Sequence, residues 1–171
     1  MSSNDSEDFE LIELKTTSFR ICEDAAMRRT NESVGVLLDY FDNKTGGGRL
    51  ASRSDFDPLE LHGLIPRICL FDFERNIEGE VVDAMMRLQG SEIAERYRSV
   101  MGKSVREQRI EEVTERIFFL SNRISETGKP IVALAERLSE EKSYVKMSVL
   151  YIPLSDDNVT VNGALLYIET N

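Results

Sequence analysis

The stretch Arg67-Ile-Cys-Leu-Phe-Asp-Phe73, Asn76-Ile-Glu-Gly79 and Glu80-Val-Val-Asp-Ala-Met-Met-Arg-Leu88 decides the fold. Its first part is rich in strand-forming residues, and its second has the composition of a turn between paired strands. In its third part apolar and polar residues alternate, and one face of the extended chain would carry Val82, Ala84, Met86 and Leu88. The stretch therefore predicts two antiparallel strands, the second ending at Gly90.

The residues after this strand pair predict a long helix. Ser104-Val-Arg-Glu107 has the spacing of a capping box, in which a hydroxyl and a carboxylate satisfy backbone N–H groups, so we expect the helix to start there. Apolar residues follow at steps of three and four, at Ile110, Val113, Ile117, Leu120 and Ile124. This stripe spans only two heptads, which favours a buried helix face over a coiled coil.

The last third of the chain predicts three strands, at about 131–138, 143–154 and 159–169. A turn at 155–158 would join the last two as a hairpin. The predicted order is a helix, two strands, helices and three strands. Strand pairs joined by short turns are antiparallel, and clustered helices cover one face of a sheet, so the predicted class is α+β.

An amphipathic helix is predicted at about residues 23–43. Four apolar residues form its stripe, and they are the candidates for a dimer contact: Val34, Leu37, Leu38 and Phe41. Gly46-Gly47-Gly48 would end the helix, because glycine tolerates the positive φ of a helix C-terminus. These glycines lack the Gly-Lys-Ser/Thr of a phosphate-binding P-loop. Residues 9–14 are expected to be a docked, extended arm.

Composition limits the classes of function. The chain has 171 residues, 41% of them hydrophobic, which suits one domain with one substantial core. A net charge of -10 argues against nucleic acid or an anionic membrane as a partner. Two cysteines and an acidic N-terminus without an apolar segment favour a cytoplasmic protein. We expect residues 1–20 to be an acidic, partly disordered arm and residues 21–171 to be the domain.

Residues with the chemistry of an active site are few. His62 is the only histidine, and no nucleophile pattern accompanies it. A metal site built from His62, Cys22 and Cys69 would lack any ligand-pair spacing, whereas a haem with His62 as its single axial ligand stays open. The sequence therefore predicts a protein that is not an enzyme and identifies no cofactor.

Several segments together resemble a group of stand-alone PAS-like proteins that are abundant in alphaproteobacteria. The resemblance covers residues 35–169 and rests on Leu37-Leu-Asp-Tyr40, Leu50-Ala-Ser-Arg-Ser-Asp-Phe-Asp-Pro58, Leu64-Ile-Pro66, Leu70-Phe-Asp72, Met86-Arg-Leu-Gln-Gly90, Tyr151-Ile-Pro-Leu154 and Gly163-Ala-Leu-Leu-Tyr167. It implies a five-stranded antiparallel sheet with helices over one face, and a sensory or regulatory role. The motif residues Arg53, Asp55, Asp57 and Pro58 are expected to be structural, with Arg53 holding a carboxylate by a bidentate contact.

The functional hypothesis is a pocket between the sheet and the helices. Its expected lining comprises Met86, Leu88, Phe118, Tyr144 and Tyr151. Arg87 would either form an ion pair on the outer face of the sheet or hold an anionic group of the ligand. Ligand binding would change an interface with a second copy or with a signalling protein. The alternatives are a constitutive interaction module with a filled core and, more weakly, a small-pocket enzyme.

Overall fold

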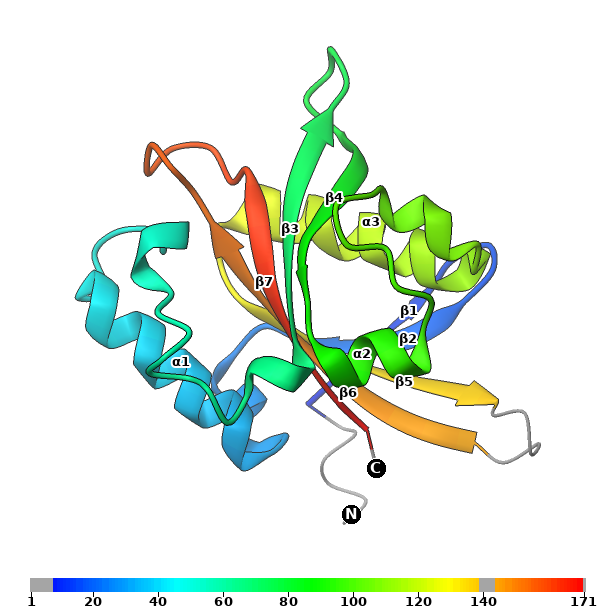
Figure 1. Ribbon diagram of the computed structural model, residues 1–171, viewed down its shortest axis with the longest axis horizontal. Helices are drawn as coiled ribbons and strands as arrows, with labels where there is room; N and C mark the ends of the chain where they lie inside the picture. Colours follow the sequence, from blue (N-terminus) through cyan, green and yellow to red (C-terminus); the bar gives the residue numbers. More distant parts are fainter. Residues whose placement is uncertain (1–7, 139–143, 171) are drawn as a thin grey trace.

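The computed structural model describes residues 8–138 and 144–170 and consists of one antiparallel sheet with helices on both faces (Figure 1). Across the sheet, the order of the seven strands is β1 (Glu10–Glu13), β2 (Ser18–Cys22), β5 (Ile131–Leu138), β6 (Tyr144–Leu154), β7 (Gly163–Thr170), β3 (Ile68–Arg75) and β4 (Val81–Gln89). The helices are α1 (Glu32–Thr45), α2 (Ser91–Arg96) and α3 (Glu111–Thr127). The predicted α+β class is confirmed.

The sheet separates two hydrophobic cores. Alternate residues of β7 show this division: Ala164 and Leu166 pack on the side of α3, and Leu165 and Tyr167 pack on the side of α1. The same alternation runs along β6. The predicted N-terminal helix therefore covers one face, and α3 covers the other. No helix within the described ranges is long and apolar enough to cross a membrane.

The N-terminal segment adds two strands to the expected five. Residues 9–14, expected as an extended arm, include β1, which pairs with the unexpected strand β2. In turn β2 pairs with β5 through only three residues, Arg20, Ile21 and Cys22. The first seven residues of the predicted acidic arm lie outside the described part of the chain.

Helix α1 begins later than predicted and ends as predicted. A 3-10 turn at Ala25–Arg29 comes first, and the side chain of Asp24 caps it by accepting a hydrogen bond from the backbone N–H of Ala26. Asn31 then caps α1 in the same way, with 2.9 Å between its Oδ1 and the backbone nitrogen of Val34. Gly46 ends the helix with a φ of 66°, which is the left-handed geometry that favours glycine.

Helix α3 also starts after its predicted position. Ser104 caps a separate 3-10 turn at Val105–Gln108, and Arg109 then breaks the helical path with a φ of 58°. The predicted stripe is nevertheless correct from Val113 onward, and its members Ile117, Leu120 and Ile124 are buried against the sheet.

Two bulges divide the predicted alternation of β4. Leu70 pairs with Leu88 while Phe71 pairs with Met86, so Arg87 is an extra residue in β4. The extra residue shifts the side-chain phase, and Leu88 packs on the α1 side whereas Met86 packs on the α3 side. A second irregularity at Glu74 and Arg75 accompanies the exposure of Val82. The prediction that Val82, Ala84, Met86 and Leu88 share one face is therefore wrong for Val82 and for Leu88.

Candidate functional site

A cavity of about 40 Å³ lies in the core between the sheet and α3. Most of its wall is aliphatic or aromatic, with Met86 and Met147 among the lining residues. Four lining residues carry oxygen or nitrogen groups in their side chains, namely Tyr97, Gln108, Arg116 and Tyr151, and the thiol of Cys69 also lines the cavity. An apolar space with a few converging polar groups is typical of a small-molecule site.

The structure brings together two of the predicted pocket residues. Met86 and Tyr151 both line the cavity, from β4 and β6. Leu88 lies on the opposite face because of the bulge, so its expected place beside Met86 is corrected. Phe118 packs at the edge of the α3-side core with the guanidinium of Arg106 4.5 Å from its ring centre. The side chain of Tyr144 lies outside what the structure describes.

Arg87 is exposed and forms an ion pair. Its Nε lies 2.5 Å from Oδ2 of Asp72 on the neighbouring strand β3. Of the two roles expected for Arg87, this is the ion pair and not the ligand contact. Both side chains are nearly half exposed, so the pair contributes little to stability.

Arg116 is the cavity residue that the sequence analysis missed. It lies on α3 among the apolar stripe residues and is only 8% exposed. Its Nη2 lies 3.8 Å from the sulfur of Met147, and no carboxylate in the described ranges lies within ion-pair distance of it. A buried guanidinium without a counter-charge is costly, which is why buried arginines are normally paired. Its position three residues after Val113, on the apolar face, was the available signal.

Gln108 and Tyr151 are buried beside this guanidinium. Gln108 is 8% exposed and Tyr151 is 2% exposed. Within the described ranges, neither side chain has a hydrogen-bond partner, although buried polar groups are normally hydrogen-bonded. Burial raises the pKa of the Tyr151 phenol, while the charge of Arg116 opposes this rise. The phenol therefore stays protonated and available as a donor.

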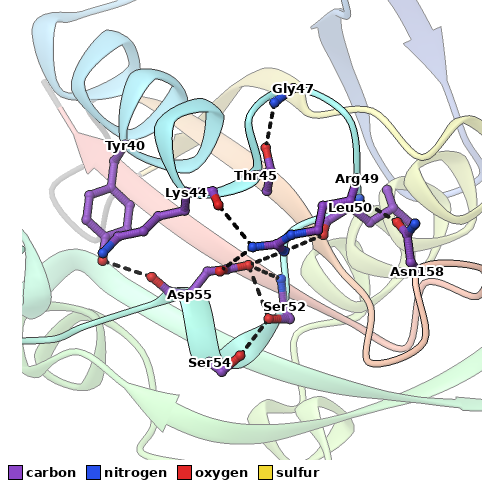
Figure 2. Close-up of polar contacts among 10 residues, drawn as sticks. All are labelled: Tyr40, Lys44, Thr45, Gly47, Arg49, Leu50, Ser52, Ser54, Asp55 and Asn158. Atoms are coloured by element: carbon purple, nitrogen blue, oxygen red, sulfur yellow. Dashed lines mark hydrogen bonds and ion pairs between the residues drawn. The ribbon is translucent and has the colours of Figure 1, made fainter.

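A second polar cluster surrounds Asp55, at the end of α1 (Figure 2). Arg49 donates two hydrogen bonds to the Asp55 carboxylate, at 2.7 Å from Nη1 to Oδ2 and 2.8 Å from Nη2 to Oδ1. Nη2 also donates to the carbonyl oxygen of Lys44, and the backbone N–H of Ser52 donates to Asp55. The cluster thus fastens the C-terminus of α1 to the segment that leads into β3.

The predicted motif residues take structural positions, with one change of partner. The bidentate arginine is Arg49 and not Arg53, which is half exposed and lies 3.8 Å from Asp72. Asp57 accepts a hydrogen bond from the backbone N–H of Leu59 and so closes the turn that includes Pro58. The sequence could not choose between the two arginines, because both flank the same loop.

The Arg49–Asp55 contact predicts a loss of stability in acid. Hydrogen bonds from Arg49 hold the pKa of Asp55 far below its usual range, so the carboxylate stabilises the fold at neutral pH and this contribution falls as pH drops below about 4. We expect Asp55→Asn to lower the free energy of unfolding by about 2 kcal/mol at pH 7. Urea unfolding at pH 7 and pH 3 checks this: the difference from wild type should shrink at pH 3, and an unchanged difference would contradict it.

The four candidate dimer residues are buried within the chain. Val34 and Leu37 are fully inaccessible, and Leu38 and Phe41 are at most 7% exposed, all packed on the sheet. They are therefore unavailable for the proposed contact between two copies. The stripe at helical spacing marks the α1-side core instead.

The three candidate metal ligands do not form a cluster in the described part of the chain. Cys22 belongs to the α1-side core, Cys69 to the α3-side core, and His62 is exposed in a turn. In the described ranges no group of three histidine, cysteine or acidic side chains is placed to hold a metal ion. Both thiols are free, and burial raises their pKa, to about 11 for Cys22 and about 12 for Cys69.

Comparison with known proteins identifies the family. The family model for the PAS domain matches residues 29–166, which include α1, β3 to β6, the first half of β7 and all of the cavity lining except Ile168. Among solved structures, that of an RNA-binding Light-Oxygen-Voltage receptor is similar, with 14% sequence identity and a TM-score of 0.37. The match covers 71% of this chain and 36% of the receptor chain. No curated protein matches the sequence. The chain belongs to the PAS domain family and is a sensory or regulatory domain of the PAS type.

Proposed function

We propose that this PAS domain senses a small ligand that binds in the cavity beneath α3 and that occupancy changes its association with a protein partner or a second copy. The observation that carries this proposal is the buried Arg116 guanidinium, which lines the cavity and faces no counter-charge among the described residues. A ligand that supplies its partner would remove an electrostatic cost that the empty domain carries.

Helix α3 offers a route from the cavity to the surface. Phe119 of α3 contacts Phe19 of β2 edge to face, with ring centres 5.7 Å apart. Oε1 of Glu115 accepts a hydrogen bond from the backbone N–H of Thr16, and Arg123 forms an ion pair with Glu23 at 2.7 Å. A ligand that shifts α3 would therefore also shift the β1–β2 hairpin, which is attached to β5 by a short pairing.

We also propose that the domain binds its ligand without transforming it. The polar groups at the cavity include the Arg116 guanidinium, the Gln108 amide and the protonated Tyr151 phenol. The thiol of Cys69 also lines the cavity, and burial raises its pKa to about 12. These groups are suited to donating hydrogen bonds and not to accepting a proton near neutral pH. The two unpaired thiols fit a reducing compartment, so we propose a cytoplasmic location.

Ligand binding is tested by native mass spectrometry and by thermal shifts across a library of small metabolites. We expect a bound adduct, or a rise in Tm with at least one class of compound. A cavity-filling variant, Val149→Leu, should stabilise the empty protein by about 1 kcal/mol and weaken this response, because Val149 lines the cavity.

The matched control is Val132→Leu, which adds the same methylene in the α1-side core, away from the cavity. Overpacking should destabilise this variant by about 1 kcal/mol or more while the ligand response survives. If native mass spectrometry shows no bound adduct and no compound shifts the Tm of wild type, the sensor function is rejected in favour of a constitutive interaction module. A full ligand response in Val149→Leu would reject the cavity as the binding site.

A further inference from the structure

We propose that the ligand is a small carboxylate whose two oxygens bind the guanidinium of Arg116. The proposal rests on the proposed function, because it names the chemistry of the molecule that would enter the same cavity. It follows from three features: the charge of the cavity, its volume and the nature of its walls.

The charge of the cavity requires an anion. Arg116 is more than nine-tenths buried, and its guanidinium is a cation with five N–H donors and no acceptor. Its contact among the described residues is the sulfur of Met147, a weak acceptor at 3.8 Å. A planar carboxylate matches the fork of a guanidinium with two parallel hydrogen bonds, which makes it the best-fitting partner for this side chain.

Two neighbouring polar side chains also favour an anionic ligand. Gln108 and Tyr151 line the cavity with Arg116 and have amide and phenol protons without a partner in the described ranges. The phenol is held protonated by its burial. Three donors around one small space are suited to a group that only accepts hydrogen bonds, as an ionised carboxylate does.

The volume limits the size of the ligand. A cavity needs about 10–15 Å³ to hold one water molecule, so a cavity of about 40 Å³ holds about three groups of that size. That is close to the size of acetate or propionate. The remaining wall is apolar, with Phe71, Ile117 and Leu166 among its members, and it suits a short hydrocarbon tail better than a fully hydrated phosphate.

Met147 is shared between the cavity and a neighbouring cleft. It lines both the cavity and a larger cleft of about 640 Å³ between β2 and β5, where Phe19 and Ala135 also lie. This side chain therefore borders both spaces. Methionine has three rotatable bonds and adapts to its surroundings, so movement of this one side chain would admit a small molecule.

The experiment measures binding of acetate, propionate and butyrate to the full chain by thermal shift and isothermal titration calorimetry at pH 7. Arg116→Met removes the charge and keeps the length of the side chain. It should raise the Tm of the empty protein, because an uncompensated buried charge is replaced by an apolar group. It should also weaken carboxylate binding by about 10-fold to 100-fold, while Arg116→Lys, which keeps the charge, should lose less.

The matched control is Arg96→Met on α2, where the arginine is exposed and close in sequence to the cavity residues Ile93 and Tyr97. Its carboxylate affinity should equal that of wild type. Propionamide, which is neutral and has nearly the shape of propionate, should not compete. Inorganic phosphate tests whether the cavity binds anions in general. If phosphate binds as tightly as propionate, the assignment to a carboxylate is overturned.

The outcomes separate this proposal from the proposed function. Equal carboxylate binding by wild type and Arg116→Met, or a lower Tm of the empty Arg116→Met protein, would overturn the role of Arg116. If a neutral compound binds to wild type but not to Val149→Leu, and no carboxylate binds, the assignment to a carboxylate is overturned and the proposed sensor function stands. A bare mass with no response to any compound would overturn both.

Discussion

Leu37→Asp is expected to prevent folding. Leu37 lies in the middle of the α1-side core with no exposed surface, and α1 is the helix that covers this face of the sheet. An aspartate there would lose the buried leucine side chain, worth about 2–5 kcal/mol, and would add an unpaired buried carboxylate. Together these costs approach the whole stability of a domain of this size. Circular dichroism and size-exclusion chromatography should show an unfolded or aggregated chain.

The matched control is Val36→Asp, one position earlier on the same helix, where the valine is 47% exposed. This variant should fold with a stability close to that of wild type. The pair also tests the hypothesis that this stripe forms a dimer contact, under which replacing Leu37 and Leu38 with aspartate would give a folded monomer. A folded, monomeric Leu37→Asp protein would contradict the packing of α1 on the sheet.

Gly90→Ala is expected to destabilise the domain by about 3 kcal/mol or more. Gly90 follows β4, and its backbone N–H donates to the carbonyl oxygen of Ile68 at 2.8 Å. A Cβ atom there would lie 2.3 Å from the carbonyl oxygen of Pro66 and 2.6 Å from that of Ile65. Both are backbone atoms, so relief requires a shift of the main chain between the 3-10 turn Ile65–Arg67 and β4. Urea unfolding measures the loss.

Conformational preference is not the reason for this glycine. Its φ of -60° is accessible to alanine, so the expected loss comes from the close approach alone. Gly63→Ala is the control, since a Cβ at Gly63 would meet no atom within 4 Å. That variant should stay within about 0.5 kcal/mol of wild type. Similar losses in both variants would point to a general cost of replacing glycine.

Local patterns predicted most of the fold. The β3–β4 pair, the stripe of α3 and the last three strands all have periodicities or turns that lie within a few neighbouring residues. Strand β2 was missed because it has five residues and pairs with β5, more than a hundred positions further along the chain. The bulge at Arg87 was missed for a related reason, since an extra residue is visible only against the partner strand.

The candidate site was predicted in part. Met86 and Tyr151 were expected at the pocket because methionine and aromatic side chains suit an adaptable apolar pocket. Arg116 was missed because its burial depends on Met147, 31 residues away, and because an isolated arginine on a helix usually faces solvent. A charged residue within an apolar stripe was the signal, and it indicated a site only once the cavity was visible.

The bulge at Arg87 changes which face of the sheet the side chains of β4 point to. Residues before it contribute Ala84 and Met86 to one core, and the residue after it contributes Leu88 to the other. Deleting this one residue would restore plain alternation and leave Met86 and Leu88 on their present faces, because each would keep its partner on β3. The cavity wall should therefore tolerate both loss of the residue at position 87 and substitution of its exposed side chain, whereas loss of a paired residue of β4 would move part of the wall to the opposite face.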